Sequence, residues 1–397
     1  MNIRTTAPTA AERVLSAFEG AMGIPRPVHV RCWDDSEAGP ESDITVFRNR
    51  RAVRRVLWSP NELGLVRAYV SGDLEIEGDV FRLLALPDLV DKLGTLSVRG
   101  SDRRSVLKSL TTGNDFYTLF LGPTMVYSCA YWDQRSGSSE TTGTLEEAQD
   151  DKLDLICRKL CLRSGMRLLD VGCGWGSMAI HAAEKYDVSV VWVTLSHEQA
   201  EWARARVSEA GLSDRIEIRV QDYRDVADGP YDAISSIGMS EHVGDSALPG
   251  YAEHLHDLLR PEGRLLNHAI ASVRSLTGTE NSPGLIENYI FPDGEVLPLS
   301  STLDAFEHAG LEVRDVEALR EHYALTLRAW VSRLRDSWDD AVRLAGTERA
   351  RTWLLYLAAS ALGFEEKGRL TIHQVLAVRP SDDGSSGLPR TRALWLR

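Results

Sequence analysis

The chain has few cysteines and no long apolar run. Its 397 residues include five cysteines, an odd number whose spacing matches no disulfide framework. No stretch reaches the roughly 18 apolar residues that a membrane-spanning helix needs, and the first twenty residues contain no signal-peptide core. These absences argue against a disulfide-bonded secreted scaffold and predict a protein of the reducing cytoplasm.

Positive charge is also scarce. Lys and Arg number 45 against 58 Asp and Glu, which gives a formal net charge of −13. Most general nucleic-acid binders present a net basic face, so this balance argues against nucleic acid as a partner. The basic residues that gather locally are Arg48, Arg50, Arg51, Arg54 and Arg55, then Arg103, Arg104 and Lys108. Helical i,i+4 pairs in the first group predict either a solvated face or a docking site for anionic phosphate groups.

The remaining composition is that of a globular protein, with 43% hydrophobic and 26% charged residues. Residues 1–96 are predicted to form a small mixed α+β domain, and residues 97–150 a linker and active-site lid. Within the latter, aromatic and polar residues interleave so closely over 113–132 that they favour a pocket lining over a regular helix. Strands alternate with helices over 151–380, which predicts an α/β domain with a parallel sheet. Residues 381–397 are a polar tail.

A glycine-rich turn follows an apolar strand predicted at 167–171. The segment RLLDVGCGWGSMAI carries Gly172, Gly174 and Gly176 and opens a helix, an arrangement that places a ligand at the carboxyl end of a strand. The spacing G-x-G-x-G differs from the G-x-G-x-x-G of dinucleotide binding. The next predicted strand also lacks the acidic residue that an NAD ribose requires. Both features argue against a dehydrogenase. The loop could still bind a small ligand other than a dinucleotide.

The loop D-V-G-C-G-W-G resembles the cofactor loop of class I S-adenosylmethionine (SAM) methyltransferases. Further motifs occur in order around it: YSCAYW, TLEEAQDDKLDLICRKL, VTLSHEQ, QDYRD, SIGMSEHVG, NYIFPDGEVLP and HYALTLRAW. Over roughly Gly113 to Val378 the chain resembles the cyclopropane fatty acid synthase and mycolic acid cyclopropane synthase family. This resemblance implies a Rossmann-like methyltransferase domain, and an N-terminal domain that handles lipid and supports a homodimer.

The resemblance implies methyl transfer from SAM to an unactivated alkene in a phospholipid acyl chain at the inner membrane surface, forming a cyclopropane. Methylation of an alkene leaves a carbocation, so the site must be dry and aromatic and must contain a base. The family holds a bicarbonate ion for that purpose. The corresponding catalytic residues here are Cys129, Glu241, His268 and Tyr323, beside the backbone of Ile270.

The same resemblance implies which residues contact the cofactor. The predicted SAM-binding residues are Tyr127, Ser128, Asp170, Gly172, Gly174, Gly176, Thr194, Leu195, Gln199, Asp222 and Tyr223. The predicted aromatic lining comprises Phe116, Tyr117, Tyr131, Tyr289 and Phe291. No metal site is predicted, because Cys157 and Cys161 lie four residues apart on a helix with no further ligand to complete a zinc set.

Three departures from the family pattern leave alternatives open. Ser109, Leu110 and Thr111 stand where the family commonly has His-Tyr-Asp, Ser240 replaces an aromatic residue, and Trp192 replaces a glycine that borders the adenosine. One alternative is a hydride shift that yields a methylene or methyl branch. A second is C-methylation of a soluble specialised metabolite. A non-catalytic SAM- or lipid-binding protein is the third, and the retained catalytic residue types argue against it.

Overall fold

The computed structural model describes residues 7–22, 29–40, 44–53, 68–81, 113–132, 143–172, 174–273, 296–365 and 370–394. The chain divides into two compact units. Unit 1 comprises Met1–Leu119, Glu280–Pro292 and Val331–Leu362, and unit 2 comprises Phe120–Thr279, Asp293–Trp330 and Gly363–Arg397. The functional boundaries at residues 96, 150 and 380 stay a prediction.

Unit 1 contains a four-stranded sheet in the order β2-β1-β3-β4. Its elements are α1 (Ala10–Met22), β1 (His29–Cys32), β2 (Glu37–Ala38), β3 (Ile44–Phe47) and β4 (Leu74–Glu77). The buried Arg351 of α16 (Thr347–Glu365) donates to the carbonyl of Tyr69 at 2.8 Å and pairs with Glu75. In the predicted arginine helix, residues 50–53 are helical. The arginines at 54, 55, 103 and 104 and the lysine at 108 lie outside the described residues.

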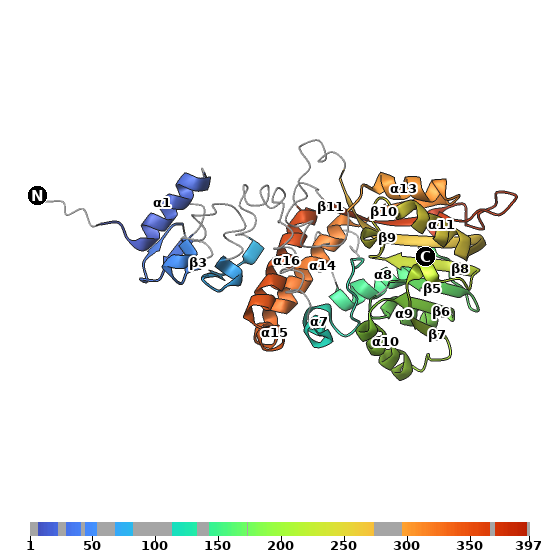
Figure 1. The fold of residues 1–397 in the computed structure, drawn as a ribbon, viewed down its shortest axis with the longest axis horizontal. Helices are drawn as coiled ribbons and strands as arrows, with labels where there is room; N and C mark the ends of the chain where they lie inside the picture. Colours follow the sequence, from blue (N-terminus) through green and yellow to red (C-terminus); the bar gives the residue numbers. More distant parts are fainter. Residues whose placement is uncertain are drawn as a thin grey trace, which may run out of the picture. The chain divides into compact units, whose positions relative to one another are not determined.

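Unit 2 is built on a seven-stranded sheet in the order β10-β11-β9-β8-β5-β6-β7 (Figure 1). Its strands are β5 (Arg167–Val171), β6 (Ser189–Thr194), β7 (Ile216–Val220), β8 (Tyr231–Ile237), β9 (Leu259–Ser272), β10 (Glu312–Ala318) and β11 (Leu370–Val378). Only the pairings of β11 are antiparallel. The predicted α/β fold is confirmed.

Helices cover both faces of this sheet (Figure 1). They are α8 (Leu145–Lys159), α9 (Ser177–Tyr186) and α10 (His197–Glu209) on one face, and α11 (Leu248–Leu258) and α13 (Leu299–His308) on the other. Successive strand residues point to opposite faces, so Leu168 packs toward α8 and α9 while Leu169 packs toward α11 and α13. The strands are therefore apolar on both sides, as a covered parallel sheet requires.

One expectation about local structure is wrong. The aromatic segment expected as a pocket lining begins with a regular helix, α7 (Asn114–Leu121). Phe116 and Phe120 are both buried, so the interleaved pattern hides an apolar stripe with i,i+4 spacing. Two further helices come later in the chain, α14 (Arg320–Asp336) and α15 (Trp338–Ala345).

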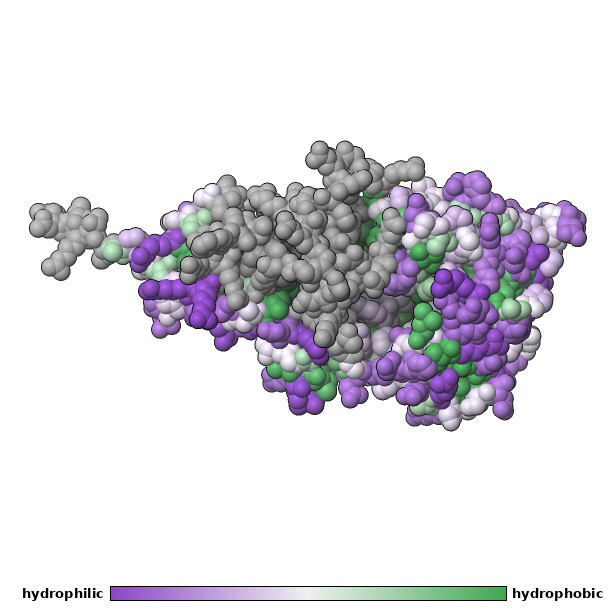
Figure 2. Space-filling view, viewed as in Figure 1, coloured by the Kyte–Doolittle hydropathy of each residue, from purple (hydrophilic) through white to green (hydrophobic). Residues whose placement is uncertain are grey.

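The surface of unit 2 is largely polar on the face seen in Figure 2. Among the described residues, no helix is long and apolar enough to cross a bilayer.

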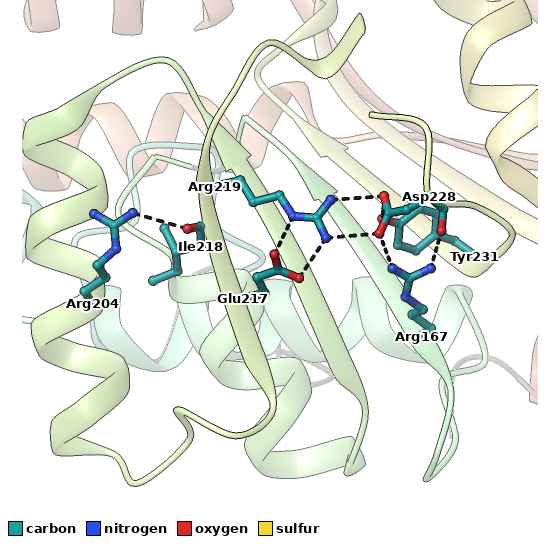
Figure 3. A network of polar contacts seen from close by, with 7 residues as sticks. All are labelled: Arg167, Arg204, Glu217, Ile218, Arg219, Asp228 and Tyr231. Atoms are coloured by element: carbon teal, nitrogen blue, oxygen red, sulfur yellow. Dashed lines mark hydrogen bonds and ion pairs between the residues drawn. The ribbon is translucent and has the colours of Figure 1, made fainter. Parts of the chain in front are cut away.

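At the β7 edge of the sheet, Arg219 bridges Glu217 and Asp228 (Figure 3). Asp228 also pairs with Arg167 and accepts a hydrogen bond from the Tyr231 hydroxyl. Charged side chains on an edge strand oppose pairing with another chain.

Thr144 begins α8 with a reciprocal capping box. Its hydroxyl accepts from the backbone N–H of Glu147, whose Oε2 accepts from the Thr144 N–H at 2.7 Å. We expect Thr144→Ala to lower the free energy of unfolding by about 1 kcal/mol, because an orphan N–H loses its acceptor. Urea denaturation measures the change. Thr144→Ser keeps the oxygen and should match the native protein; equal losses in both variants would contradict the capping role.

Candidate active site

The glycine loop lies directly after β5, the strand at which chain connections diverge to either side of the sheet. Gly172, Gly174 and Gly176 have φ values of +75°, +60° and +81°, a region that residues with a Cβ rarely adopt. A Cβ on Gly172 would lie 3.1 Å from the sulfur of Met239. The loop therefore requires glycine both for its backbone conformation and for its close approach to the segment after β8.

Polar groups beside the loop are held in fixed positions. Asp170 is fully buried and accepts from the Ser235 hydroxyl at 2.7 Å. Thr194, at the end of β6, donates to the Oε1 of Gln199 at 3.0 Å. Leu195 follows with 71% of its surface exposed, unusual for a leucine. These residues lie at the carboxyl ends of β5 and β6, and their role in binding SAM stays a prediction.

Asp222 and Tyr223 follow β7 at the same edge of the sheet. The Arg224 guanidinium hydrogen-bonds to Asp222 at 2.7 and 2.9 Å and holds the pKa of that carboxyl below its usual range. Asp222 is therefore an ionised acceptor. The ring of Tyr223 packs edge-on against Tyr251, with centroids 5.4 Å apart.

Trp192 departs from the family's glycine, and the structure places it away from the surface. Its side chain is fully buried in the core between the sheet and α9. Its nearest ring atom is 4.0 Å from the point that a Cβ on Gly176 would occupy. The indole thus packs beneath the glycine loop.

Residues 127–132 pass through unit 2 without regular secondary structure. On one side they are held by side chains of α8. Gln149 Nε2 donates to the Ser128 carbonyl at 2.9 Å, and Lys152 Nζ donates to the Ser128 hydroxyl at 2.8 Å. Both side chains are buried, with 1% of their surface exposed. Neither was predicted to belong to the site, although both lie within the motif TLEEAQDDKLDLICRKL.

On the other side, the 127–132 segment is held by α14. Thr326 Oγ1 accepts from the Ala130 N–H and from the Trp132 indole N–H, both at 3.1 Å. His322 Nδ1 accepts from the Trp132 N–H at 2.9 Å. A buried segment outside helices and strands needs such side-chain partners, since unpaired backbone groups are costly.

Glu241 lies in the short 3-10 helix Ser240–His242, just beyond β8. It is 3% exposed, and its Oε1 accepts from the backbone N–H of Ile270 at 2.7 Å. Its Oε2 has no hydrogen-bond partner in the part of the chain that the structure describes. Burial raises the pKa of this carboxyl to about 7, against the lowering effect of the Ile270 N–H. Glu241 therefore changes charge near neutral pH.

His268 lies on β9, on the same face as Ile270 two residues later. It is 1% exposed, and neither ring nitrogen has a partner among the described residues. Burial, and then the positive charge of Lys152, hold its pKa well below the usual range, so the ring is neutral. Gln374, its register partner on β11, is also fully buried, with both amide atoms unpartnered within the described chain.

Cys129 and Tyr323 meet at the carbonyl of Leu319. That oxygen accepts from the Tyr323 N–H at 3.1 Å and from the Cys129 thiol, whose sulfur is 3.7 Å away. The Leu319 N–H donates to Ile372, which pairs in register with Ile270. Hydrogen bonds of backbone and side chains, together with the pairing of β9 and β11, thus connect the four predicted catalytic residues. Burial raises the pKa of the Cys129 thiol, which is therefore un-ionised.

The aromatic groups near these residues differ from the predicted lining. Trp330 is fully buried and packs against Tyr127, Tyr323 and Phe120, with centroids 5.3, 6.1 and 6.2 Å apart. It joins a predicted cofactor residue to a predicted catalytic one. The i,i+7 spacing of Tyr323 and Trp330 in HYALTLRAW was the available signal, because it places both on one face of a helix.

Three of the five predicted lining residues lie among the described residues, two in unit 1 and one in unit 2. Phe116 and Tyr117 pack against Trp353 in unit 1, at 5.8 and 5.4 Å. Tyr131 stacks on His322 at 4.9 Å in unit 2. The predicted residues at 289 and 291 lie outside the described residues, as does the departure at 109–111.

The strand order of unit 2, with a glycine loop at the central strand, defines the class I SAM-dependent methyltransferase fold. The family model for mycolic acid cyclopropane synthetase matches residues 99–375. The chain belongs to this family, and it is a SAM-dependent methyltransferase of that type. The resemblance carried by the sequence motifs is confirmed.

Relatives agree with this assignment. A "probable fatty acid methyltransferase" of Pseudomonas putida is 39% identical over 383 residues, which are 92% of this chain and 95% of the relative. The cyclopropane-fatty-acyl-phospholipid synthase of Escherichia coli K12 is 38% identical over 272 residues, covering 68% and 67%. The crystal structure of the mycolic acid cyclopropane synthase CmaA1 with SAH and CTAB has a TM-score of 0.61 and 32% identity, covering 71% of this chain and 99% of that one.

Thr326 is the shared acceptor that fixes the 127–132 segment. We expect Thr326→Val to lower the free energy of unfolding by about 3 kcal/mol, since two buried donors lose their acceptor. Chemical denaturation measures this loss. Thr326→Ser retains the oxygen and should lose less than about 1 kcal/mol. Equal stability of the valine and serine variants would show that the hydroxyl does not hold the segment.

Glu241 should make stability depend on pH. Its folded pKa of about 7 lies above the ordinary 4.5, so the folded state keeps a proton that the unfolded state has lost. The native protein should therefore lose stability relative to Glu241→Gln as pH rises from 4.5 to 7, by about 3 kcal/mol in total. Urea denaturation of both proteins over this range measures the difference. Parallel pH profiles would contradict the raised pKa.

Proposed function

We propose that the protein transfers a methyl group from SAM to an unactivated alkene in an acyl chain of a membrane phospholipid, and that the product closes to a cyclopropane. The observation that carries this proposal is the buried pair Glu241 and His268. A carboxyl that titrates near neutral pH and a neutral imidazole, both with polar atoms unpartnered among the described residues, are costly to bury without a function.

The carboxyl ends of the strands suit SAM. The glycine loop admits close approach of a ligand, and the ionised Asp222 offers an acceptor to hydroxyl or amino groups. The exposed Leu195 side chain offers an apolar surface to the flat adenine ring of SAM. Tyr127 is half-exposed and reaches toward the aromatic group around Trp330. The predicted SAM-binding residues are thus suitable by position and chemistry.

The chemistry requires a dry site, because water would trap the carbocation left by methylation. The rings of Tyr323 and Trp330 present faces that stabilise positive charge. The un-ionised thiol of Cys129 does not compete as a nucleophile, since the thiolate is the reactive form. One proton must then leave the transferred methyl group, and the electron pair of that C–H bond closes the ring onto the cationic carbon.

The buried polar atoms fit a small anion such as bicarbonate. His268 offers a ring N–H, and a protonated Glu241 offers an O–H. Bicarbonate, when bound, would supply the base. The protein's own residues would orient it and exclude water.

A methylene- or methyl-branched product is the second candidate. The relative named a fatty acid methyltransferase matches 92% of this chain, whereas the cyclopropane synthase of Escherichia coli matches 68%. In addition, Ser240 stands where the family often has an aromatic ring, and its hydroxyl accepts from Asn267 at 3.3 Å. With one ring fewer beside the cation, a hydride shift competes with ring closure. C-methylation of a soluble metabolite would require no lipid surface.

Membrane docking through the arginine cluster, a cytoplasmic location and a homodimer complete the proposal. Two described members of the cluster already have partners. Arg48 pairs with Glu75 at 3.0 Å, and the Arg50 guanidinium lies 5.7 Å from the centroid of the Trp33 ring. Each further basic residue near an anionic leaflet would contribute about 1 kcal/mol to binding.

The product decides between the candidates. Purified protein, methyl-labelled SAM and vesicles of monounsaturated phospholipid should yield labelled fatty acids by gas chromatography–mass spectrometry. Proton NMR should then show ring protons, because cyclopropane and methylene products have the same mass. Signals of an exocyclic methylene would replace the first candidate with the second. Label in soluble alkenes alone would remove phospholipid as the substrate.

The same assay tests whether the Glu241 carboxyl takes part in catalysis. We expect Glu241→Gln to lower kcat by roughly 10²-fold or more, because general acid–base groups contribute about that much. Glu253→Gln, an exposed carboxylate on α11, is the matched control and should retain native turnover. Native kcat in Glu241→Gln would remove Glu241 from the catalytic site.

A further inference from the structure

Arg206, in the last turn of α10, contacts two segments of unit 2 that are predicted to lie beside SAM. Its Nη1 donates to the carbonyl of Trp175 and to the Ser177 hydroxyl, both at 3.2 Å, where the glycine loop runs into α9. The same atom donates at 3.1 Å to the carbonyl of Thr124, which stands three residues before the 127–132 segment. One guanidinium therefore connects the glycine loop to the chain that leads into that segment.

The Thr124 carbonyl belongs to a strained turn. It accepts from the Ser177 hydroxyl as well as from Arg206. The next residue, Met125, is buried and has a φ of +55°, a conformation that residues with a Cβ rarely adopt. Such a conformation persists only where the surrounding structure holds it. Side chains of α9 and α10 supply two of the contacts that hold this turn.

The backbone of the glycine loop lets α10 come close. A Cβ on Gly176 would lie 3.2 Å from the Cβ of Ala203, which is fully buried one turn before Arg206 on the same face of the helix. Gly176 is also the N-cap of α9 and has no side chain to fix the start of that helix. Arg206 contacts the residue on either side of it, so α10 fixes the end of the loop.

We propose that Arg206 is a positioning residue for SAM, which fixes the separation of the glycine loop and the 127–132 segment. In assigning both of these segments to SAM, the inference rests on the proposed function. Side chains of α8 and α14 hold the 127–132 segment independently of α10. Without Arg206, that segment keeps its place and the glycine loop loses a connection to it, so the cofactor binds less tightly.

Three variants separate this contact from general effects on α10. Arg206→Met removes every donor and keeps an apolar stem, whereas Arg206→Lys keeps a cationic donor. Arg204→Met is the matched control, because Arg204 lies on the same helix and donates instead to the Ile218 carbonyl of β7, at 3.2 Å (Figure 3). Urea denaturation without ligand identifies the variants that fold.

The first readout is the dissociation constant of S-adenosylhomocysteine, measured by calorimetry. Arg206→Met should weaken binding by roughly tenfold or more, because three acceptors lose a charged donor. Arg206→Lys should bind more tightly than Arg206→Met, and Arg204→Met should stay within about twofold of the native protein. Native affinity in Arg206→Met, or an equal loss in Arg204→Met, would overturn the proposal.

The second readout asks whether Arg206 and Ser177 act together. Ser177→Ala removes the hydroxyl that donates to Thr124. In the double variant, the loss of affinity should be smaller than the product of the two single losses, because residues that share one network are not additive. Losses that simply multiply would show independent effects and contradict the shared contact. If Arg206→Met does not fold, Arg206→Lys takes its place in this comparison.

The third readout separates binding from chemistry in the vesicle assay. In Arg206→Met, the KM for SAM should rise while kcat at saturating SAM stays close to the native value, since the predicted catalytic residues keep their positions. A lower kcat with an unchanged KM would overturn the proposal. Calorimetry needs no alkene, so a native protein that binds S-adenosylhomocysteine but methylates no lipid would remove the proposed function while the role of Arg206 is still decided.

Discussion

The site depends on how one irregular segment is held inside unit 2. Residues 127–132 have no strand or helix to satisfy their backbone, and side chains of α8 and α14 supply the partners. These partners come from parts of the chain far apart in sequence, so the segment can be ordered only when both helices are in place. Tyr127, Ser128 and Cys129 are the residues whose positions this arrangement sets.

The sheet then acts as a common frame for the predicted catalytic residues. Ile270 donates to Glu241, pairs in register with Ile372, and through it is linked to Leu319. The carbonyl oxygen of Leu319 accepts a hydrogen bond from the Cys129 thiol. Rigid strand pairing therefore controls the separation of groups that arise from four different elements. Such control matters because small displacements of catalytic groups cost large factors in rate.

Burial gives the site its chemical character. The pKa of Glu241 rises to about 7, that of His268 falls, and that of the Cys129 thiol rises, in each case mainly because the charged form loses hydration. All three pKa shifts favour the neutral form of the group.

The α/β fold, the strand that ends in the glycine loop, and the family were all predictable from the sequence. Those features depend on local periodicity, on glycine at positive φ, and on motif order. Other features were not predictable from local patterns. The helix α7, the aromatic group around Trp330, the roles of Gln149 and Lys152, and the shared contact at Leu319 involve residues distant in the chain. Whether a buried lysine or glutamine is a core residue or part of a site depends on which polar atoms lie opposite it, and only the tertiary structure decides that.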